Sequence, residues 1–335
     1  MSEDFRSVEK AAVKTPRLRG VAPTGLTADN SGVPDSAESY QLQEHLAQLY
    51  GAGTARMLSK RLQVMAQAVN LAESAAFDHT PTELTERDQL LITYGDTVVD
   101  ESRAPLATLR EFADSELRDA FSGVHILPFF PYSSDDGFAV IDYTQVREDL
   151  GDWDDVKALS ERFDLMFDLV INHCSREHLW FADFVGGRQP GCDYFLTPDV
   201  AADLSQVVRP RNTPLLSPVH TYQGVRHVWT TFGEDQVDLN FANPDVLCRM
   251  VEIILLYVQR GARFLRLDAI AFLWKRPGSN CSSLPETHAV VKVLRLLLKL
   301  SGADVCLLTE TNVPHQENVS YFGNRDEAQL VYQFS

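Results

Sequence analysis

Positive charge is scarce in this sequence. Its 335 residues include 47 Asp and Glu but only 30 Lys and Arg, which gives a formal net charge of -17 at pH 7. Nucleic-acid backbones and anionic membrane surfaces attract basic proteins. The composition therefore argues against both as partners, and nothing in the sequence specifies an oligomeric state.

Long hydrophobic runs are also missing. The longest, IILLYV at 253–258, is far shorter than the roughly 20 apolar residues that a membrane-spanning helix needs. The N-terminal stretch MSEDFRSVEKAAVK lacks the apolar core of a secretion signal. We therefore expect a cytoplasmic protein that does not enter a membrane.

Cysteine is rare and unpatterned. The five cysteines are an odd number, are widely spaced and form no CxxC pair. We therefore expect free thiols. They are Cys174, Cys192, Cys248, Cys281 and Cys306.

Phosphate-binding glycine motifs are absent too, since neither GxGxxG nor GxxxxGK[ST] occurs. What the sequence does contain is an alternation of short apolar strands with helical segments, which predicts a parallel sheet. Polar residues gather where these strands end, and this favours a (β/α)8 TIM barrel over an open sheet with one ligand crevice. Those residues are Asp96, Asn172, His173, Asp268 and Glu310.

The same alternation suggests a domain organisation. We expect a flexible tail at 1–36 and an N-terminal helical extension at 37–88 that contains two helices. The barrel would comprise 89–174 and 241–335, interrupted after its third strand by a small inserted domain at 175–240. The last apolar strand, AQLVYQF, is the sixth, so we expect a truncated barrel that cannot close, from a partial record or an inactive product.

The segment GARFLRLDAIAFLWK at 261–275 places charged residues within an apolar strand. Arg266 and Asp268 share one strand face, and a nearby guanidinium favours the ionised form of a carboxylate. Glu310 ends the apolar run VCLLTE, where burial favours the protonated form. Two such carboxyl groups about 5 Å apart cleave a glycosidic bond with retention of configuration. The alternative is that Arg266 and Asp268 form a structural ion pair.

Three segments resemble signature regions of the α-amylase-type glycoside hydrolases, in the correct order and spacing. They are DLVINH at 168–173, FLRLDAI at 264–270 and LLTET at 307–311. The resemblance covers about residues 89–335. It implies a (β/α)8 barrel that acts on glycosidic bonds.

Narrower matches resemble the sucrose phosphorylase branch of that family, including GVHILPFFPYSSDDGFAVIDY at 123–143 and RPR at 209–211. This resemblance implies transfer of an α-glucosyl group from sucrose, sucrose 6′-phosphate, glucosylglycerate or glucosylglycerol to phosphate. The product would be α-glucose 1-phosphate. Inorganic phosphate would be a co-substrate, and no cofactor is expected.

The resemblance also implies roles for individual residues. Asp268 would be the nucleophile and Glu310 the acid/base, and Arg266 would orient Asp268. His173 and Asp135 would hydrogen-bond the bound glucosyl ring.

Five further residues receive expectations in the same way. Phe138 would form the apolar wall beside the glucosyl ring. Arg211 would bind phosphate through its planar guanidinium, with Arg209 and His315 as weaker candidates. Asn172 resembles a calcium ligand of amylases, but no acidic cluster accompanies it, so we expect no metal.

Structural alternatives stand beside these roles. His173 could bond to backbone in the core, and Asp135 and Asp136 could form a turn before Gly137. The arginines of 209–211 could lie on an exposed loop. At the level of function, the alternatives are a hydrolase or transglucosidase that uses the same two carboxylates, and a non-catalytic remnant that binds sugars or a partner.

Overall fold

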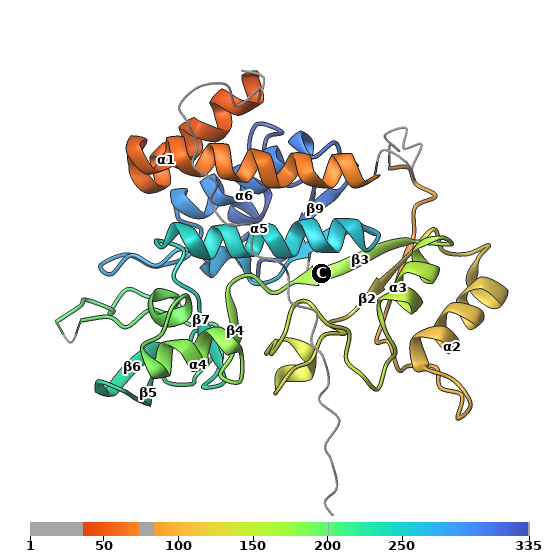
Figure 1. The fold of residues 1–335 in the computed structure, drawn as a ribbon, viewed down its shortest axis with the longest axis horizontal. Helices are drawn as coiled ribbons and strands as arrows, with labels where there is room; N and C mark the ends of the chain where they lie inside the picture. Colours follow the sequence, from red (N-terminus) through yellow and green to blue (C-terminus); the bar gives the residue numbers. More distant parts are fainter. Residues whose placement is uncertain (1–35, 74–83, 200, 334–335) are drawn as a thin grey trace, which may run out of the picture. The chain divides into compact units, whose positions relative to one another are not determined.

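Six parallel strands form the main sheet of the computed structural model, which describes residues 36–73, 84–199 and 201–333. Their order in the sheet, β1-β2-β3-β8-β9-β10, is that of consecutive strands in a (β/α)8 barrel, so the predicted fold is confirmed (Figure 1). The strands are β1 (Leu90–Thr93), β2 (Gly123–Ile126), β3 (Asp164–Leu169), β8 (Ala262–Leu267), β9 (Cys306–Thr309) and β10 (Leu330–Val331).

Helical segments alternate with these strands along the chain. Local sequence explains where several of them begin: Asp152 accepts hydrogen bonds from the N–H groups of Asp154 and Asp155 and so caps α3, while Asn243 caps α5 ahead of Pro244. No helix within the described residues is both long and apolar enough to cross a bilayer. The helical segments are α2 (Pro105–Phe112), η1 (Ala113–Leu117), α3 (Trp153–Ser160), α5 (Pro244–Gln259), η4 (Ile270–Phe272), α6 (Pro285–Leu300) and α7 (His315–Ser320).

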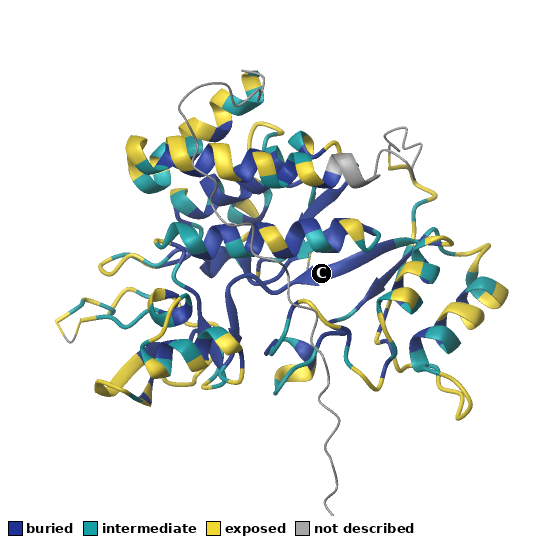
Figure 2. Cartoon of the chain, in the orientation of Figure 1, coloured by how far each residue is buried: buried dark blue, intermediate teal, exposed yellow. Residues whose placement is uncertain are grey.

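The two faces of β8 pack against different partners, as the period-two pattern predicts. Leu265 and Leu267 belong to the main core with the buried side chains of α5 and α6. Phe264 packs on the opposite face with Met166 of β3 and Leu308 of β9, and Arg266 continues that row. Figure 2 shows the central strands of the main sheet buried, whereas the helices expose their outer faces. Arg266 therefore points to the interior side of the sheet.

A long helical element precedes the barrel. It is α1 (Ala37–Glu73), and it contains a break at Gly51, where φ is 79° and ψ is 157°. Glycine tolerates this positive φ at no steric cost, so the element is two helices in effect, as the sequence suggests. It packs on α5 and α6 (Figure 1). Residues 74–83 of the expected extension, and 1–35 of the expected tail, lie outside the described residues.

The segment between β3 and α5 carries its own small elements. β4 (His173–Ser175) pairs antiparallel with β7 (Gln236–Asp238), and β5 (Leu216–Thr221) forms a hairpin with β6 (Gly224–Trp229). The β4–β7 pair brings residues 236–238 beside His173 at the end of β3. Helical segments in and near this region are η2 (Asp135–Gly137), α4 (Leu179–Gly186) and η3 (Gly191–Asp193).

Candidate active site

Seven of the residues singled out from the sequence line one cavity. Its volume is about 300 Å³, and it lies at the carboxyl ends of β3, β8 and β9. These ends are where a barrel fold carries its chemistry. The seven residues are Asp135, Phe138, His173, Arg211, Arg266, Asp268 and Glu310.

The sheet itself holds the two carboxyl groups in place. The N–H of Asp268 donates to Leu169 O, and the N–H of Glu310 donates to Leu267 O, so the parallel ladder continues past the strand ends. The Ala269 N–H, next to Asp268, donates to Glu310 Oε2 at 3.0 Å. The two carboxyl groups are thus fixed on neighbouring strands.

Arg266 lies between three carboxyl groups. Its Nη1 donates to Asp268 Oδ1 at 3.0 Å and also to Asp168 Oδ1, while its Nη2 lies 4.0 Å from Glu310 Oε2. The Arg266 side chain is only 12% exposed, so these contacts are poorly screened by water. The contact with Asp268 agrees with the expected orienting role, and the geometry is also that of a structural ion pair.

Two opposing influences act on the charge of Asp268. Burial is the largest influence and raises the pKa of Asp268 to about 7, although Arg266 acts in the opposite direction. Glu310 and Asp168 raise this pKa further, because a second negative charge nearby disfavours ionisation. Arg266 therefore favours the ionised form of Asp268, as expected from the sequence, but burial outweighs this effect. One guanidinium is shared by three carboxyl groups and does not offset the loss of water.

Asp168 was not among the predicted site residues. It is fully buried, and its Oδ2 lies 2.8 Å from Nε2 of His125 on the neighbouring strand β2. A signal for it existed, because DLMFDLVINH places a carboxylate in the middle of an apolar strand, as RFLRLDAI does for Arg266. Asp168 therefore anchors Arg266, although Asp168 is not among the residues that line the cavity.

Asp135 and His173 meet through Gln236, a residue the sequence did not suggest. Gln236 Nε2 donates to Asp135 Oδ2 at 2.9 Å and lies 3.1 Å from His173 Nε2. Asp135 and Asp136 both have a positive φ, 55° and 51°, so the turn expected before Gly137 also exists. Both aspartates line the cavity, as does Gln236. Asp135 thus belongs to the expected turn and also lines the cavity, and its contact with a glucosyl ring stays a prediction.

His173 also makes the backbone contact that was its structural alternative. Its Nε2 lies 3.0 Å from Phe138 O, and burial lowers the pKa of the imidazole. The neutral form is favoured in this setting. Phe138 turns its ring toward Arg266, with the guanidinium carbon 5.6 Å from the ring centroid, and Phe232 lies beside the His173 ring. The cavity therefore has an aromatic wall next to its polar groups.

The three residues expected to bind phosphate differ in their position relative to the cavity. Arg211 is exposed and lines the cavity, and its backbone oxygen accepts a hydrogen bond from Arg209 Nη2 at 3.5 Å. Arg209 and His315 lie outside the described lining of this cavity. The structure thus brings one cation of the RPR motif to the carboxyl groups and leaves the weaker candidates away from it.

Asn172 contacts a protein cation. Its Oδ1 accepts a hydrogen bond from Lys275 Nζ at 2.7 Å, and Lys275 Nζ also lies 2.6 Å from Asp238 Oδ2. Across the described ranges, no group of three or more His, Cys, Asp or Glu residues is arranged to hold a metal ion. The amide oxygen that resembles a calcium ligand is therefore already used by an ammonium group.

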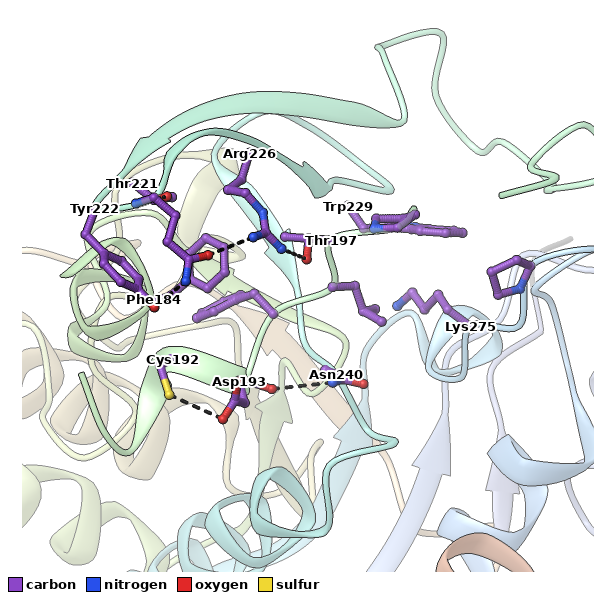
Figure 3. A pocket seen from close by; sticks show the side chains of 15 residues that line it. Phe184, Cys192, Asp193, Thr197, Thr221, Tyr222, Arg226, Trp229, Asn240 and Lys275 are labelled. Carbon is purple, nitrogen blue, oxygen red and sulfur yellow. Dashed lines mark hydrogen bonds between the residues drawn. The ribbon is translucent and has the colours of Figure 1, made fainter. Parts of the chain in front are cut away.

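A larger cavity, about 420 Å³, lies in the segment between β3 and α5 (Figure 3). Arg226 projects into it and donates to Gln223 Oε1 and Thr197 Oγ1, and Lys275 lies at its edge. Its described lining has one carboxylate, Asp193, and none of the seven predicted residues. We take the smaller cavity as the candidate active site, because it gathers two carboxyl groups around one guanidinium.

Comparisons with known proteins agree with the barrel fold described above. Residues 120–335 match the family described as "Alpha amylase, catalytic domain". The chain is 48% identical over 300 residues to glucosylglycerate phosphorylase from Spirochaeta thermophila, covering 88% of this chain and 51% of that protein. It is 33% identical over 258 residues to sucrose phosphorylase from Streptococcus mutans, covering 73% of this chain and 52% of that protein.

A solved structure shows the same likeness. The crystal structure of sucrose 6F-phosphate phosphorylase from Thermoanaerobacter thermosaccharolyticum superimposes with a TM-score of 0.66 at 29% identity, covering 75% of this chain and 53% of that one. The chain spans about half the length of the curated relatives it matches.

Proposed function

This chain belongs to the α-amylase catalytic-domain family, and we propose that it carries the nucleophile and the acid/base of a retaining glycoside phosphorylase. The observation that supports this most is the sharing of Arg266 by Asp268 and Glu310 at the end of neighbouring barrel strands. The similarity to phosphorylases of glucosylglycerate and sucrose supports phosphate as the acceptor.

In the first step, a carboxylate oxygen of ionised Asp268 attacks the anomeric carbon of an α-glucosyl group. The bond from that carbon to the leaving-group oxygen breaks, and Glu310 gives this oxygen its proton. The leaving group departs as an alcohol, and a glucosyl ester of Asp268 remains. Asp135, His173 and Phe138 hold the glucosyl ring, since all three line the cavity.

In the second step, a phosphate oxygen attacks the anomeric carbon and the ester bond to Asp268 breaks. Configuration inverts twice, so the product is α-glucose 1-phosphate. Arg211 supplies the positive charge that phosphate requires at a site rich in carboxylates. Ionised Asp268 is regenerated, and Glu310 takes up the proton that a hydrogen phosphate loses.

Among the donors considered, glucosylglycerate has the strongest support, because identity is 48% to a glucosylglycerate phosphorylase and 33% to a sucrose phosphorylase. We therefore propose glucosylglycerate as the preferred glucoside. The expected cytoplasmic location and the absence of a cofactor remain predictions from the sequence.

The test is an assay of the purified protein with glucosylglycerate, sucrose, sucrose 6′-phosphate and glucosylglycerol, each with and without phosphate. We expect phosphate-dependent release of α-glucose 1-phosphate, greatest with glucosylglycerate. Equal release of free glucose without phosphate would instead identify a hydrolase. No product at high protein concentration would contradict a catalytic role for this chain. Asp268→Asn and Glu310→Gln are the inactive controls, and Asp149→Asn, which alters an exposed carboxylate, is the active one.

A further inference from the structure

Lys275 is a buried cation next to the candidate active site. It follows η4 in the loop after Asp268, its side chain is only 2% exposed, and the side chain of its partner Asp238 is fully buried. An isolated buried charge is costly, so Lys275 and Asp238 need each other. Asp238 also accepts hydrogen bonds from the N–H and the hydroxyl of Thr231. Lys275, Asp238 and Thr231 therefore form a buried polar cluster in which the two charges are paired.

The cluster fixes the orientation of the Asn172 amide. An ammonium group only donates hydrogen bonds, so the atom of Asn172 that faces Lys275 Nζ at 2.7 Å is the amide oxygen. The amide nitrogen must then face the other way. There it donates to Asp238 Oδ2 at 3.1 Å and lies 3.2 Å from Nδ1 of His173.

The amide orientation in turn fixes the tautomer of His173. Because Asn172 Nδ2 is a donor, Nδ1 of His173 must be the unprotonated acceptor, and the ring proton is carried by Nε2. Nε2–H then donates to Phe138 O at 3.0 Å. The opposite tautomer would also have a partner, since Gln236 Nε2 lies 3.1 Å from the same ring nitrogen and could donate to it. Local contacts of Nε2 therefore do not decide between the tautomers.

We propose that Lys275 is a positioning residue that, through Asn172, keeps the proton of His173 on Nε2 at the wall of the candidate active site. His173 lines that cavity, so the proton placement determines whether Nε2, which contacts Phe138 O and Gln236 there, acts as a donor or as an acceptor. The inference that this matters for turnover rests on the proposed function. The inference about the tautomer does not.

The first experiment observes the tautomer directly. Long-range proton–nitrogen NMR of ¹⁵N-histidine-labelled protein distinguishes a protonated Nε2 from a protonated Nδ1, and the His173→Gln spectrum assigns the signal. We expect Nε2–H in the wild-type protein. Lys275→Met removes the charge and shortens the side chain by one atom. The Asn172 amide oxygen then loses its donor and the amide is held only through Asp238, so we expect the Nδ1–H form to gain population. Lys299→Met, which alters an exposed lysine, leaves the His173 signal unchanged.

A rescue experiment keeps the proposal testable where Lys275→Met folds poorly. Lys275→Ala leaves room for a small alkylammonium ion, so the variant is prepared in ethylammonium chloride and then dialysed into sodium chloride of the same ionic strength. We expect His173 to carry its proton on Nε2 in ethylammonium chloride and to populate the Nδ1–H form after dialysis into sodium chloride. An Nε2–H form that persists in Lys275→Met, or in Lys275→Ala after dialysis, overturns the proposal.

The catalytic consequence has its own readout. We expect kcat/KM for phosphorolysis to fall roughly tenfold in Lys275→Ala, the value of one hydrogen bond lost at the cavity wall, and to recover with ethylammonium but not with sodium. A wild-type protein that makes no α-glucose 1-phosphate refutes the proposed function while the NMR result stands. An active wild type with an equally active Lys275→Met variant refutes the positioning role.

Discussion

Asp168 and Arg266 are register partners on the parallel strands β3 and β8, and Nη1 of Arg266 donates to Oδ1 of Asp168. The same nitrogen donates to Asp268 at 3.0 Å. The guanidinium is therefore anchored on a fully buried carboxylate before it reaches the proposed nucleophile. The position of Arg266 is therefore fixed by its contact with the neighbouring strand β3 and not only by the residues that line the cavity.

Asp168→Asn should therefore affect both stability and activity. Removing one partner of a buried ion pair leaves Arg266 with less compensation, so the free energy of unfolding should fall by about 3 kcal/mol. Because Arg266 then shifts toward Asp268 and Glu310, kcat should fall while KM changes little. Urea unfolding and steady-state kinetics measure the two effects. A variant with wild-type stability and kcat would contradict the anchoring role of Asp168.

Arg266→Lys should lose activity although the charge is kept. Arg266 reaches Asp168 and Asp268 through one nitrogen and approaches Glu310 through another, a fork that a single ammonium centre cannot reproduce. We expect kcat to fall roughly a hundredfold, equivalent to about 3 kcal/mol of transition-state stabilisation. Arg147→Lys, which alters an arginine paired with the exposed Asp149, is the matched control. An Arg266→Lys enzyme within threefold of the wild type would count against this geometry.

Activity should rise with pH through neutrality. The pKa of Asp268 in the free protein is raised to about 7 by burial, and the nucleophile must be ionised. Below that pH, kcat/KM should fall about tenfold per pH unit. Initial rates between pH 5 and 8 measure this limb. An acid limb near pH 4 would show that Arg266 outweighs burial after all.

The same shift has a consequence for stability. The pKa of Asp268 in the folded chain lies above its unfolded value, so its stabilising contribution is complete below pH 3.8 and is lost as pH rises through about 7. Asparagine cannot ionise, so Asp268→Asn should gain stability relative to the wild type between pH 5 and pH 8, by about 2 kcal/mol. Thermal unfolding at both pH values gives the comparison. If the stability difference between Asp268→Asn and the wild type is the same at pH 5 and pH 8, Asp268 does not titrate in this range.

Much of the fold could be predicted because the strands are patterned by elementary rules. The period of two in RFLRLDAI places Leu265 and Leu267 against the helices and Phe264 and Arg266 on the interior face, and the structure has this arrangement. Charged residues at strand ends also predicted correctly which end of the sheet holds the cavity. Both inferences need only the neighbours of a residue along its own strand.

Other features of the site could not be predicted, because they depend on segments far apart in the sequence. Gln236 contacts Asp135, which is 101 positions away in the sequence, and Lys275 contacts Asn172, which is 103 positions away. The sequence near these residues does not indicate either contact. The effect of burial on the pKa of Asp268 could not be predicted for the same reason. Its neighbour Arg266 was visible in the sequence, whereas the burial that outweighs Arg266 comes from the packing of several strands and loops.

The last prediction concerns the choice between phosphate and water. Arg211 lines the cavity whereas Arg209, two residues earlier in the same exposed loop, lies outside its described lining, so the two arginines form a matched pair. A guanidinium gains more from a phosphate dianion than from water, so Arg211→Gln should weaken attack by phosphate and leave hydrolysis of the glucosyl ester intact. We expect the ratio of α-glucose 1-phosphate to glucose to fall roughly tenfold or more in Arg211→Gln, with a matching rise in the KM for phosphate. Arg209→Gln should keep the wild-type ratio, because its charge does not reach the acceptor. Equal ratios in both variants would remove Arg211 from the phosphate site, and a loss confined to Arg209→Gln would move that role to the other arginine of the motif.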